Sequence, residues 1–184
     1  IHISPTGNVG IGTSNPGYSL DVKGASAVNS QNGYLTNGAD YAEWFKSDDP
    51  GLSPGQVVSL SSGVSSGSPE VSGIVKSTTS SDPLLLGVIS TKPGYIGNNP
   101  FSSAGEEEAN QTIGAYKLVA LTGQVPVKVS MENGPIEKGD YLTSSSTPGV
   151  AMKATKSGQV IGKALEEFNE QRATSNEQIM VLIN

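Results

Sequence analysis

The spacing of apolar residues near the start of the chain restricts what residues 7–24 can form. Four apolar residues alternate there with glycine or polar residues: Val9, Ile11, Leu20 and Val22. This alternation predicts two short strands that each bury one face. The intervening Ser-Asn-Pro-Gly at residues 14–17 predicts a turn between them. Because two short strands are marginal in water, we expect other copies of the chain to complete them.

Residues 7–13, Gly-Asn-Val-Gly-Ile-Gly-Thr, and residues 20–24, Leu-Asp-Val-Lys-Gly, resemble an element of tail-fibre and surface-fibre proteins. In those proteins the element precedes a C-terminal tip or processing domain. The resemblance implies a homotrimer outside the cell, on a virion appendage or a prokaryotic surface. It also implies a trimer interface at Val9, Ile11, Leu20 and Val22. The alternative is an N-terminal β-hairpin that docks on the domain behind it.

The rest of the sequence predicts an all-β fold. The 184 residues include 23 Gly and 11 Pro, and only 15% are charged, which favours short strands and turns over helices. We expect a fibre-like element at 1–24, a polar connector at 25–38 and a β-barrel or sandwich tip at 39–184. Strand-like runs occur at 56–60, 73–76, 84–90, 115–121, 124–130, 141–143, 150–154, 159–165 and 178–183.

Three stretches of the tip domain do not read as strands. Residues 61–72 and 94–112 predict loops, and the aromatic and apolar residues within 94–101 predict that this part packs against the domain. Residues 165–174 fit either a helix or a hairpin loop between two strands. We favour the hairpin loop.

A weak internal repeat also runs through the tip domain. Residues 52–60 resemble 136–144, and residues 85–90 resemble 160–165, in the same order. The repeat predicts a duplicated β unit, which is similar to the Hint-type fold of self-processing domains. The alternative is that an apolar residue, a glycine turn and a polar residue are a common way to begin a strand.

Residues 37–45, Asn-Gly-Ala-Asp-Tyr-Ala-Glu-Trp-Phe, contain the chain's one Trp and two carboxylates. The segment resembles the stretch that opens the C-terminal domain of the bacteriophage neck-appendage autopeptidases. That family is a glutamic-type self-cleaving peptidase whose domain assists trimeric assembly. The resemblance implies Asp40 and Glu43 as the acidic pair, with a cut near Thr36, Asn37 and Gly38.

The spacing of Asp40 and Glu43 sets a geometric condition on this chemistry. Two close carboxylates acquire separate pKa values, which suits an acid and base pair. Three residues apart, they share a face in a helical turn but point to opposite faces of a strand. The alternative is that Asp40 caps a turn, Glu43 faces solvent and Tyr41, Trp44 and Phe45 plug the barrel. A break at Asn37-Gly38 can also arise from spontaneous succinimide chemistry.

Composition argues against several other classes of function. The net charge is −6 without a Lys/Arg cluster, which disfavours nucleic-acid binding, and no apolar run is long enough to span a membrane. The absence of Cys excludes disulfides and zinc–thiolate sites, and His2 is a lone histidine. Asp48, Asp49 and Asp82 lack the spacing of a calcium loop and fit turn capping. We expect neither a metal nor a cofactor.

These observations favour a structural role: the C-terminal trimerisation and tip region of a homotrimeric fibre. One alternative is a self-cleaving intramolecular chaperone of the glutamic or aspartic type. The other is an adhesin tip that binds a host-surface receptor or glycan through loops 61–72 and 94–112. Tyr95, Tyr116 and Tyr141 could line such a glycan surface, although dispersed tyrosines also suit packing at a barrel edge.

Overall fold

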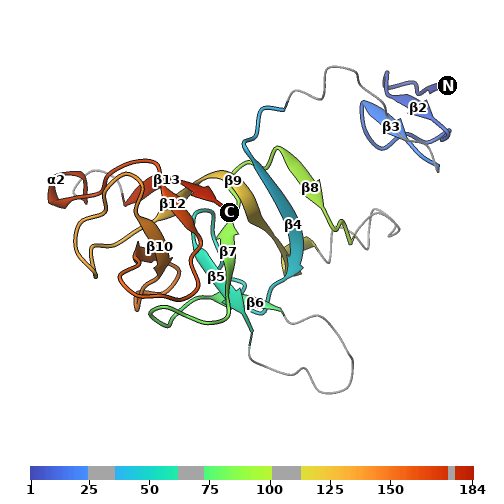
Figure 1. Cartoon of the computed structure of the whole chain (residues 1–184). Helices are drawn as coiled ribbons and strands as arrows, with labels where there is room; N and C mark the ends of the chain where they lie inside the picture. Colours follow the sequence, from blue (N-terminus) through green and yellow to red (C-terminus); the bar gives the residue numbers. More distant parts are fainter. Residues whose placement is uncertain (25–35, 62–72, 101–112, 174–176) are drawn as a thin grey trace, which may run out of the picture. The chain divides into compact units, whose positions relative to one another are not determined.

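The computed structural model describes residues 1–24, 36–61, 73–100, 113–173 and 177–184 (Figure 1). The chain separates into two compact units, Ile1–Leu35 and Thr36–Asn184. Most of the expected connector 25–38, and most of the expected loops 61–72 and 94–112, lie outside the described residues. We treat each unit by itself.

The first unit is a three-stranded sheet formed by β1 (His2–Ile3), β2 (Val9–Ile11) and β3 (Leu20–Val22). Strands β1 and β2 are antiparallel, whereas β2 and β3 are parallel. The predicted strands are therefore present, but the chain does not turn back between them as a hairpin. Residues 12–19 instead cross over one face of the sheet, so that β3 runs in the same direction as β2.

Polar contacts hold this short crossover against the sheet. The Asn8 side-chain amide donates to the Pro16 carbonyl at 3.2 Å, and the Gly17 N–H donates to the buried Asp21 carboxylate at 3.0 Å. Gly12 begins the crossover with a φ of 76°, which only glycine adopts readily. The crossover covers the face that carries Asp21, which leaves the opposite face uncovered by this unit.

The second unit is a ten-stranded sheet, so the predicted all-β fold is confirmed (Figure 1). Its strands are β4 (Asp40–Lys46), β5 (Val57–Leu60), β6 (Ile74–Lys76), β7 (Leu85–Ile89), β8 (Tyr95–Gly97), β9 (Tyr116–Lys128), β10 (Tyr141–Ser144), β11 (Ala151–Lys153), β12 (Gly162–Ala164) and β13 (Gln178–Ile183). A 3₁₀ turn, η1 (Ile113–Ala115), and one helical turn, α2 (Glu170–Ala173), complete the described elements.

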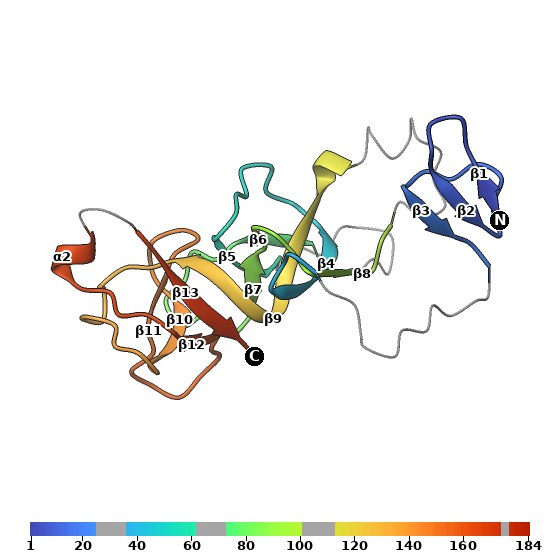
Figure 2. The same ribbon diagram turned by 90° about the horizontal axis from the view of Figure 1, so that it is seen from above.

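Strand β9 is the longest element, with 13 residues (Figure 2). The sequence predicted two strands here, 115–121 and 124–130, and that prediction was wrong. The intervening Gly123 stays within the strand at a φ of 112°. Strand β4 pairs with β9 up to Gly123, and β13 pairs with β9 from Gly123 onward. One strand therefore belongs to two sets of pairings.

The sheet consists of two equivalent halves joined through β9. The strand order is β11-β10-β12-β13-β9-β7-β5-β6. From one end the sheet begins β6-β5-β7, and from the other end it begins with the matching strands β11-β10-β12. We call β4–β7 with residues 116–121 the N-half, and residues 122–128 with β10–β13 the C-half. The match pairs the same segments as the sequence repeat. The likeness to the Hint-type fold stays a prediction.

The turns that open β5 and β10 repeat the same hydrogen bonds. The Ser53 N–H donates to the Gln56 side-chain oxygen at 2.8 Å, and the Glu137 N–H donates to the Asp140 carboxylate at 2.8 Å. A glycine with positive φ precedes the polar residue in each turn, at 80° in Gly55 and 93° in Gly139. A common strand opener would share these bonds, so the matched sheet order is what supports a true duplication.

Each half curls until its outer strand returns to the strand that begins it. Ser47, directly after β4, bridges Ile74 in β6, and Val129, directly after residues 122–128, bridges Ala151 in β11. The next residue along the chain adds a hydrogen bond in both halves, from Asp48 N to Ile74 O at 3.0 Å and from Ser130 N to Ala151 O at 2.8 Å. These contacts close both ends of the sheet.

The two halves differ in how much apolar surface they bury. One cluster of buried residues spans the C-half and reaches Val57, Val88 and Ala120 of the N-half. A smaller cluster, confined to the N-half, comprises Leu52, Val58, Ile74, Ile89 and Val119, with Phe45, Leu86 and Leu121 packed against it. The N-half therefore has the less complete core.

Two further elements revise the sequence-based expectations. Strand β8 lies in the predicted loop 94–112 and pairs in parallel with β4. The Asn98 side chain donates to the Trp44 carbonyl at 3.0 Å, so the described part of 94–101 packs on β4 as expected. Residues 165–174 connect the antiparallel strands β12 and β13, as the favoured hairpin loop requires, and α2 adds one helical turn.

Candidate functional site

Asp40 begins β4 and is 4% exposed. Its Oδ2 atom has no hydrogen-bond partner within the described residues. A buried carboxyl oxygen without a partner is costly for folding, because desolvation is not offset by a hydrogen bond. Such an atom therefore marks Asp40 as a candidate for chemistry or for a contact made outside this chain.

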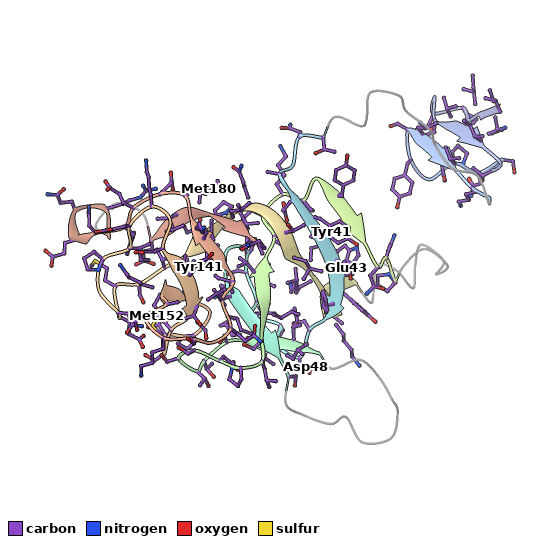
Figure 3. All side chains as sticks on the ribbon, viewed as in Figure 1. Tyr41, Glu43, Asp48, Tyr141, Met152 and Met180 are labelled. Atoms are coloured by element: carbon purple, nitrogen blue, oxygen red, sulfur yellow. The ribbon has the colours of Figure 1, made fainter. Side chains whose placement is uncertain are left out.

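Tyr41 and Glu43 form a second group on the same strand (Figure 3). The Tyr41 hydroxyl donates to Glu43 Oε1 at 2.6 Å. This hydrogen bond, with smaller contributions from burial and from the carboxylate charge, raises the pKa of Tyr41 above 10.0. Gly97 of β8 leaves room for the pair, since a Cβ at Gly97 would meet Glu43 Cγ at 3.2 Å and collide with the Tyr41 hydroxyl.

The acidic residues named from the sequence do not meet within one chain. Residues 40–46 form a strand, so Asp40 and Glu43 point to opposite faces of the sheet. A bulge between Tyr41 and Ala42 does not change this, because the extra residue of the bulge, Leu121, lies on β9. Asp40 shares its face with the buried Ala42, whereas Glu43 shares its face with Tyr41.

The segment named for cleavage runs beside residues 93–94. The Gly94 N–H donates to the Asp40 carbonyl at 2.8 Å, and the Thr36 hydroxyl donates to the Gly38 carbonyl at 2.8 Å. A side chain at Gly38 would collide with the Pro93 and Gly94 backbone. Thr36 and Asn37 are exposed. The segment is thus held against residues 93–94 at Gly38, which is half-buried.

The internal duplication shows that this site belongs to the N-half alone. Glu43 pairs with Val119, and the equivalent pair in the C-half is Val125 with Val181. Val125 is fully buried, so a carboxylate occupies a position that is apolar core in the other copy. Sequence reasoning named Glu43 but missed Tyr41 as its partner. The signal was the period-two spacing of residues 41 and 43, which a strand requires.

Two of the three aspartates considered for calcium, Asp49 and Asp82, take structural roles. Asp49 Oδ1 accepts from the Gly51 N–H at 2.8 Å, and Asp82 Oδ1 accepts from the Leu84 N–H at 2.9 Å. Both are turn-capping bonds, as the sequence predicted for these residues. Across the described ranges, no group of three or more His, Cys, Asp or Glu residues could hold a metal ion. No described helix is long and apolar enough to span a membrane.

The three tyrosines named for a glycan surface lie on different elements. Tyr95 is exposed on β8 and lies opposite Tyr41 of β4. Tyr116 begins β9 and is half-buried. Tyr141 is exposed at the start of β10 in the C-half (Figure 3). The structure therefore does not form one surface from all three.

Two solved structures are similar to this chain. The crystal structure of the C-terminal fragment of bacteriophage phi29 gene product 12 matches with a TM-score of 0.52 and 16% identity, over 79% of this chain and 100% of that one. The chain shares the fold of that fragment. The pre-mature bacteriophage phi29 gene product 12 matches with a TM-score of 0.53 and 14% identity, over 86% of this chain and 23% of that one. No protein-family model and no curated protein sequence matches the chain.

Proposed function

We propose that the chain is the C-terminal trimerisation and tip region of a virion appendage. The fold shared with a phage gene product and the resemblance of residues 7–24 to a fibre element both support an appendage. The observation that carries the proposal is the uncovered apolar face of the first unit. In this reading the protein works outside the cell, as a homotrimer.

The uncovered face contains every residue that the sequence named for the interface. Register pairs Val9 with Leu20 and Ile11 with Val22, and adds Ile3 opposite Val9, so all five side chains share one face. Ile3 is 68%, Leu20 58% and Ile11 41% exposed. Apolar side chains gathered on one face of so small a sheet are typical of a surface that another chain covers.

The second unit would assist this assembly by association. A three-stranded sheet with an open apolar face binds its copies weakly alone. Linking it to a domain whose copies associate too weakly to trimerise alone raises the effective concentration of the sheets around one another without new contacts. The tip domain would then set the register in which the three sheets meet.

The test is the mass of the full chain in solution, by light scattering and sedimentation. We expect a trimer, and we expect Ile11→Asp and Leu20→Asp to yield monomers, because a buried unpaired carboxylate opposes association. Leu84→Asp is the matched control, since Leu84 is 41% exposed but lies in the second unit. A monomeric parent chain at high concentration, or trimeric Ile11→Asp and Leu20→Asp variants, would overturn the proposal.

Self-cleavage near residues 36–38 is a second candidate function. The observations that favour it are the unpartnered, buried Asp40 Oδ2 and the exposed Thr36 and Asn37 a few residues before it in the sequence. In the reaction, water adds across a peptide bond and leaves a new carboxylate and a new amine, while Asp40 accepts and returns the proton. Glu43 of the same chain faces away, so Asp40 would have to act with another group, such as a carboxylate of a neighbouring copy.

Mass spectrometry of the assembled full chain over several days tests this candidate. Cleavage near Asn37 that stops in Asp40→Asn but continues in Asp49→Asn supports it. An intact parent chain rules it out. Cleavage that persists in Asp40→Asn and Glu43→Gln, and stops in Asn37→Gln, assigns the break to succinimide chemistry instead.

A further inference from the structure

One pair of equivalent strand positions differs in burial between the two halves. Val57 and Val88 face each other across β5 and β7, and both are fully buried in the larger core. The equivalent pair across β10 and β12 is Tyr141 and Lys163, and Tyr141 is 48% exposed. The same strand position is therefore core in the N-half and open surface in the C-half.

A hollow of about 470 Å³ lies beside Tyr141 on this surface. It is lined by Tyr141, Val160 and the loop at 154–158, which includes Thr155, Lys156 and Ser157. Its volume is within the range of sites that hold small ligands. A lining that combines an aromatic ring with hydroxyls and an ammonium suits a ligand with both an apolar face and polar groups.

The hollow is built on fixed elements. The Ala154 N–H donates to the Tyr141 carbonyl at 2.8 Å, and the Thr143 hydroxyl donates to the Gln159 carbonyl at 2.8 Å. The Lys163 ammonium lies 4.9 Å from the centroid of the Tyr141 ring. Lys163 does not line the hollow, so it restrains the ring without filling the site. Such support favours binding, because less conformational freedom is lost.

The charge around the hollow is positive in a chain of net charge −6. Lys153 is compensated by Asp140, with the ammonium and carboxylate 2.8 Å apart. Within the described ranges, neither Lys156 nor Lys163 has a carboxylate at ion-pair distance. Two lysines without such a partner beside one hollow attract an anionic group more than a neutral one.

We propose that the Tyr141 hollow binds a saccharide that carries a carboxylate. The apolar face of a sugar ring stacks on Tyr141, the carboxylate pairs with Lys156, and the sugar hydroxyls bond to Thr155 and Ser157. A small inorganic anion has no face to place on the ring, and a neutral sugar leaves Lys156 without a partner. The site is independent of the trimer interface and of residues 36–43.

The test uses ¹⁵N-labelled full chain titrated with uronate and sialic-acid oligosaccharides and with their neutral counterparts. We expect amide shifts at 141 and 154–158 with at least one acidic saccharide, weaker binding at higher salt, and roughly tenfold weaker binding in Tyr141→Ala and Lys156→Ala, which corresponds to about 1.4 kcal/mol. Lys138→Ala, an exposed lysine on the 137–140 turn, is the control and should bind as the parent does.

The proposal is overturned if no acidic saccharide shifts these amides at about 10 mM. A Kd of that size corresponds to a binding free energy of about −3 kcal/mol. The proposal is also overturned if the neutral counterparts bind equally well, or if Tyr141→Ala and Lys156→Ala both bind as the parent does. Light scattering on Tyr141→Ala separates this result from the assembly proposal, since its oligomeric state should be that of the parent chain.

Discussion

Gly87 and Gly162 occupy equivalent positions in the two halves, and at each a Cβ would press into the carbonyl of the neighbouring strand. At Gly87 the carbonyl is that of Ala120, 2.6 Å from the Cβ position, and at Gly162 it is that of Leu182. Gly87 pairs with Val58 of β5, and Gly162 pairs with Leu142, the equivalent residue of β10. The duplication thus preserves a close backbone approach.

Replacing either glycine with alanine should destabilise the second unit, and Gly162→Ala should do so more strongly, because the φ of 153° at Gly162 also disfavours a side chain. We expect Gly87→Ala and Gly162→Ala each to lower the free energy of unfolding by about 1–3 kcal/mol, because the backbone must move to admit a methyl group. Gly158→Ala is the control, as its Cβ would meet nothing within 4 Å. Urea unfolding at neutral pH measures all three, and equal midpoints for Gly158→Ala and Gly87→Ala would contradict the prediction.

Asp140 should make the second unit sensitive to acid. Burial opposes its ionised form, but the hydrogen bond and charge of Lys153 and the Glu137 N–H outweigh burial, so the pKa of Asp140 lies below 3.8. Because the folded-state pKa is lowered, its stabilisation is present above pH 3.8 and is lost as the pH falls through the folded value. The hydrogen bond to Asp140 raises the pKa of Lys153, so the stabilisation that the charged Lys153 contributes is lost only above pH 10.5.

The measurement is the urea midpoint of the parent chain and of Asp140→Asn at about pH 5 and about pH 2, on either side of the ordinary value of 3.8. Asp140→Asn should be the less stable protein at the higher pH, and the difference should shrink at the lower one. Glu167→Gln, at an exposed position, should track the parent at both. A gap that stays constant between the two pH values would show that the carboxylate charge is irrelevant.

Glu43 should control the ionisation of Tyr41. Glu43→Gln should bring the pKa of Tyr41 back toward 10.0, since a neutral amide accepts a weaker hydrogen bond from the phenol and carries no charge that opposes the phenolate. A ¹³C titration of tyrosine Cζ resonances follows this, with Tyr41→Phe to assign the signal. Glu132→Gln, which lies on a different loop, should leave the curve unchanged. An unaltered Tyr41 curve in Glu43→Gln would show that the 2.6 Å hydrogen bond does not form in solution.

Asp21 should hold the crossover of the first unit in place. Removal of its carboxylate in Asp21→Ala leaves the Gly17 N–H without its acceptor, which we expect to cost about 1–3 kcal/mol. Hydrogen exchange should speed up at 12–22 and stay unchanged in the second unit. Lys23→Ala tests the ion pair alone, at 3.8 Å, and should change little because the Lys23 side chain is 61% exposed. Protection at 12–22 equal to that of the parent chain would contradict this role.

Much of the β architecture could be predicted because short sequence motifs mark where its strands begin. Turn glycines at 55 and 139, with the polar residue that follows each, marked the starts of β5 and β10. The repeat of 85–90 at 160–165 marked β7 and β12. These signals are short-range, so they are legible without tertiary contacts. The length of β9 was not predictable, because a glycine between two apolar runs ordinarily marks a turn, and only pairing on both sides keeps Gly123 within the strand.

The parallel course of β2 and β3 was likewise hidden from sequence. The Ser-Asn-Pro-Gly segment looks like a hairpin turn, and its actual path depends on Asn8 and Asp21, which lie outside it. At the candidate site, the types and positions of Asp40 and Glu43 were evident. Whether they lie on opposite faces depends on residues 40–46 forming a strand. The pairing of Glu43 with Tyr41 depends on that strand as well.

The shared position of Gly123 has a consequence for how the second unit is attached. Asp40, the first residue of β4, and Ile183, the last residue of β13, both pair with Gly123, one on each side of β9. The start of the first strand and the end of the last strand of this domain therefore meet at one residue of β9. The domain's ends could be joined and new ends cut elsewhere with little rearrangement, and a pull on the two ends would open the pairs with β9 one after another rather than all at once.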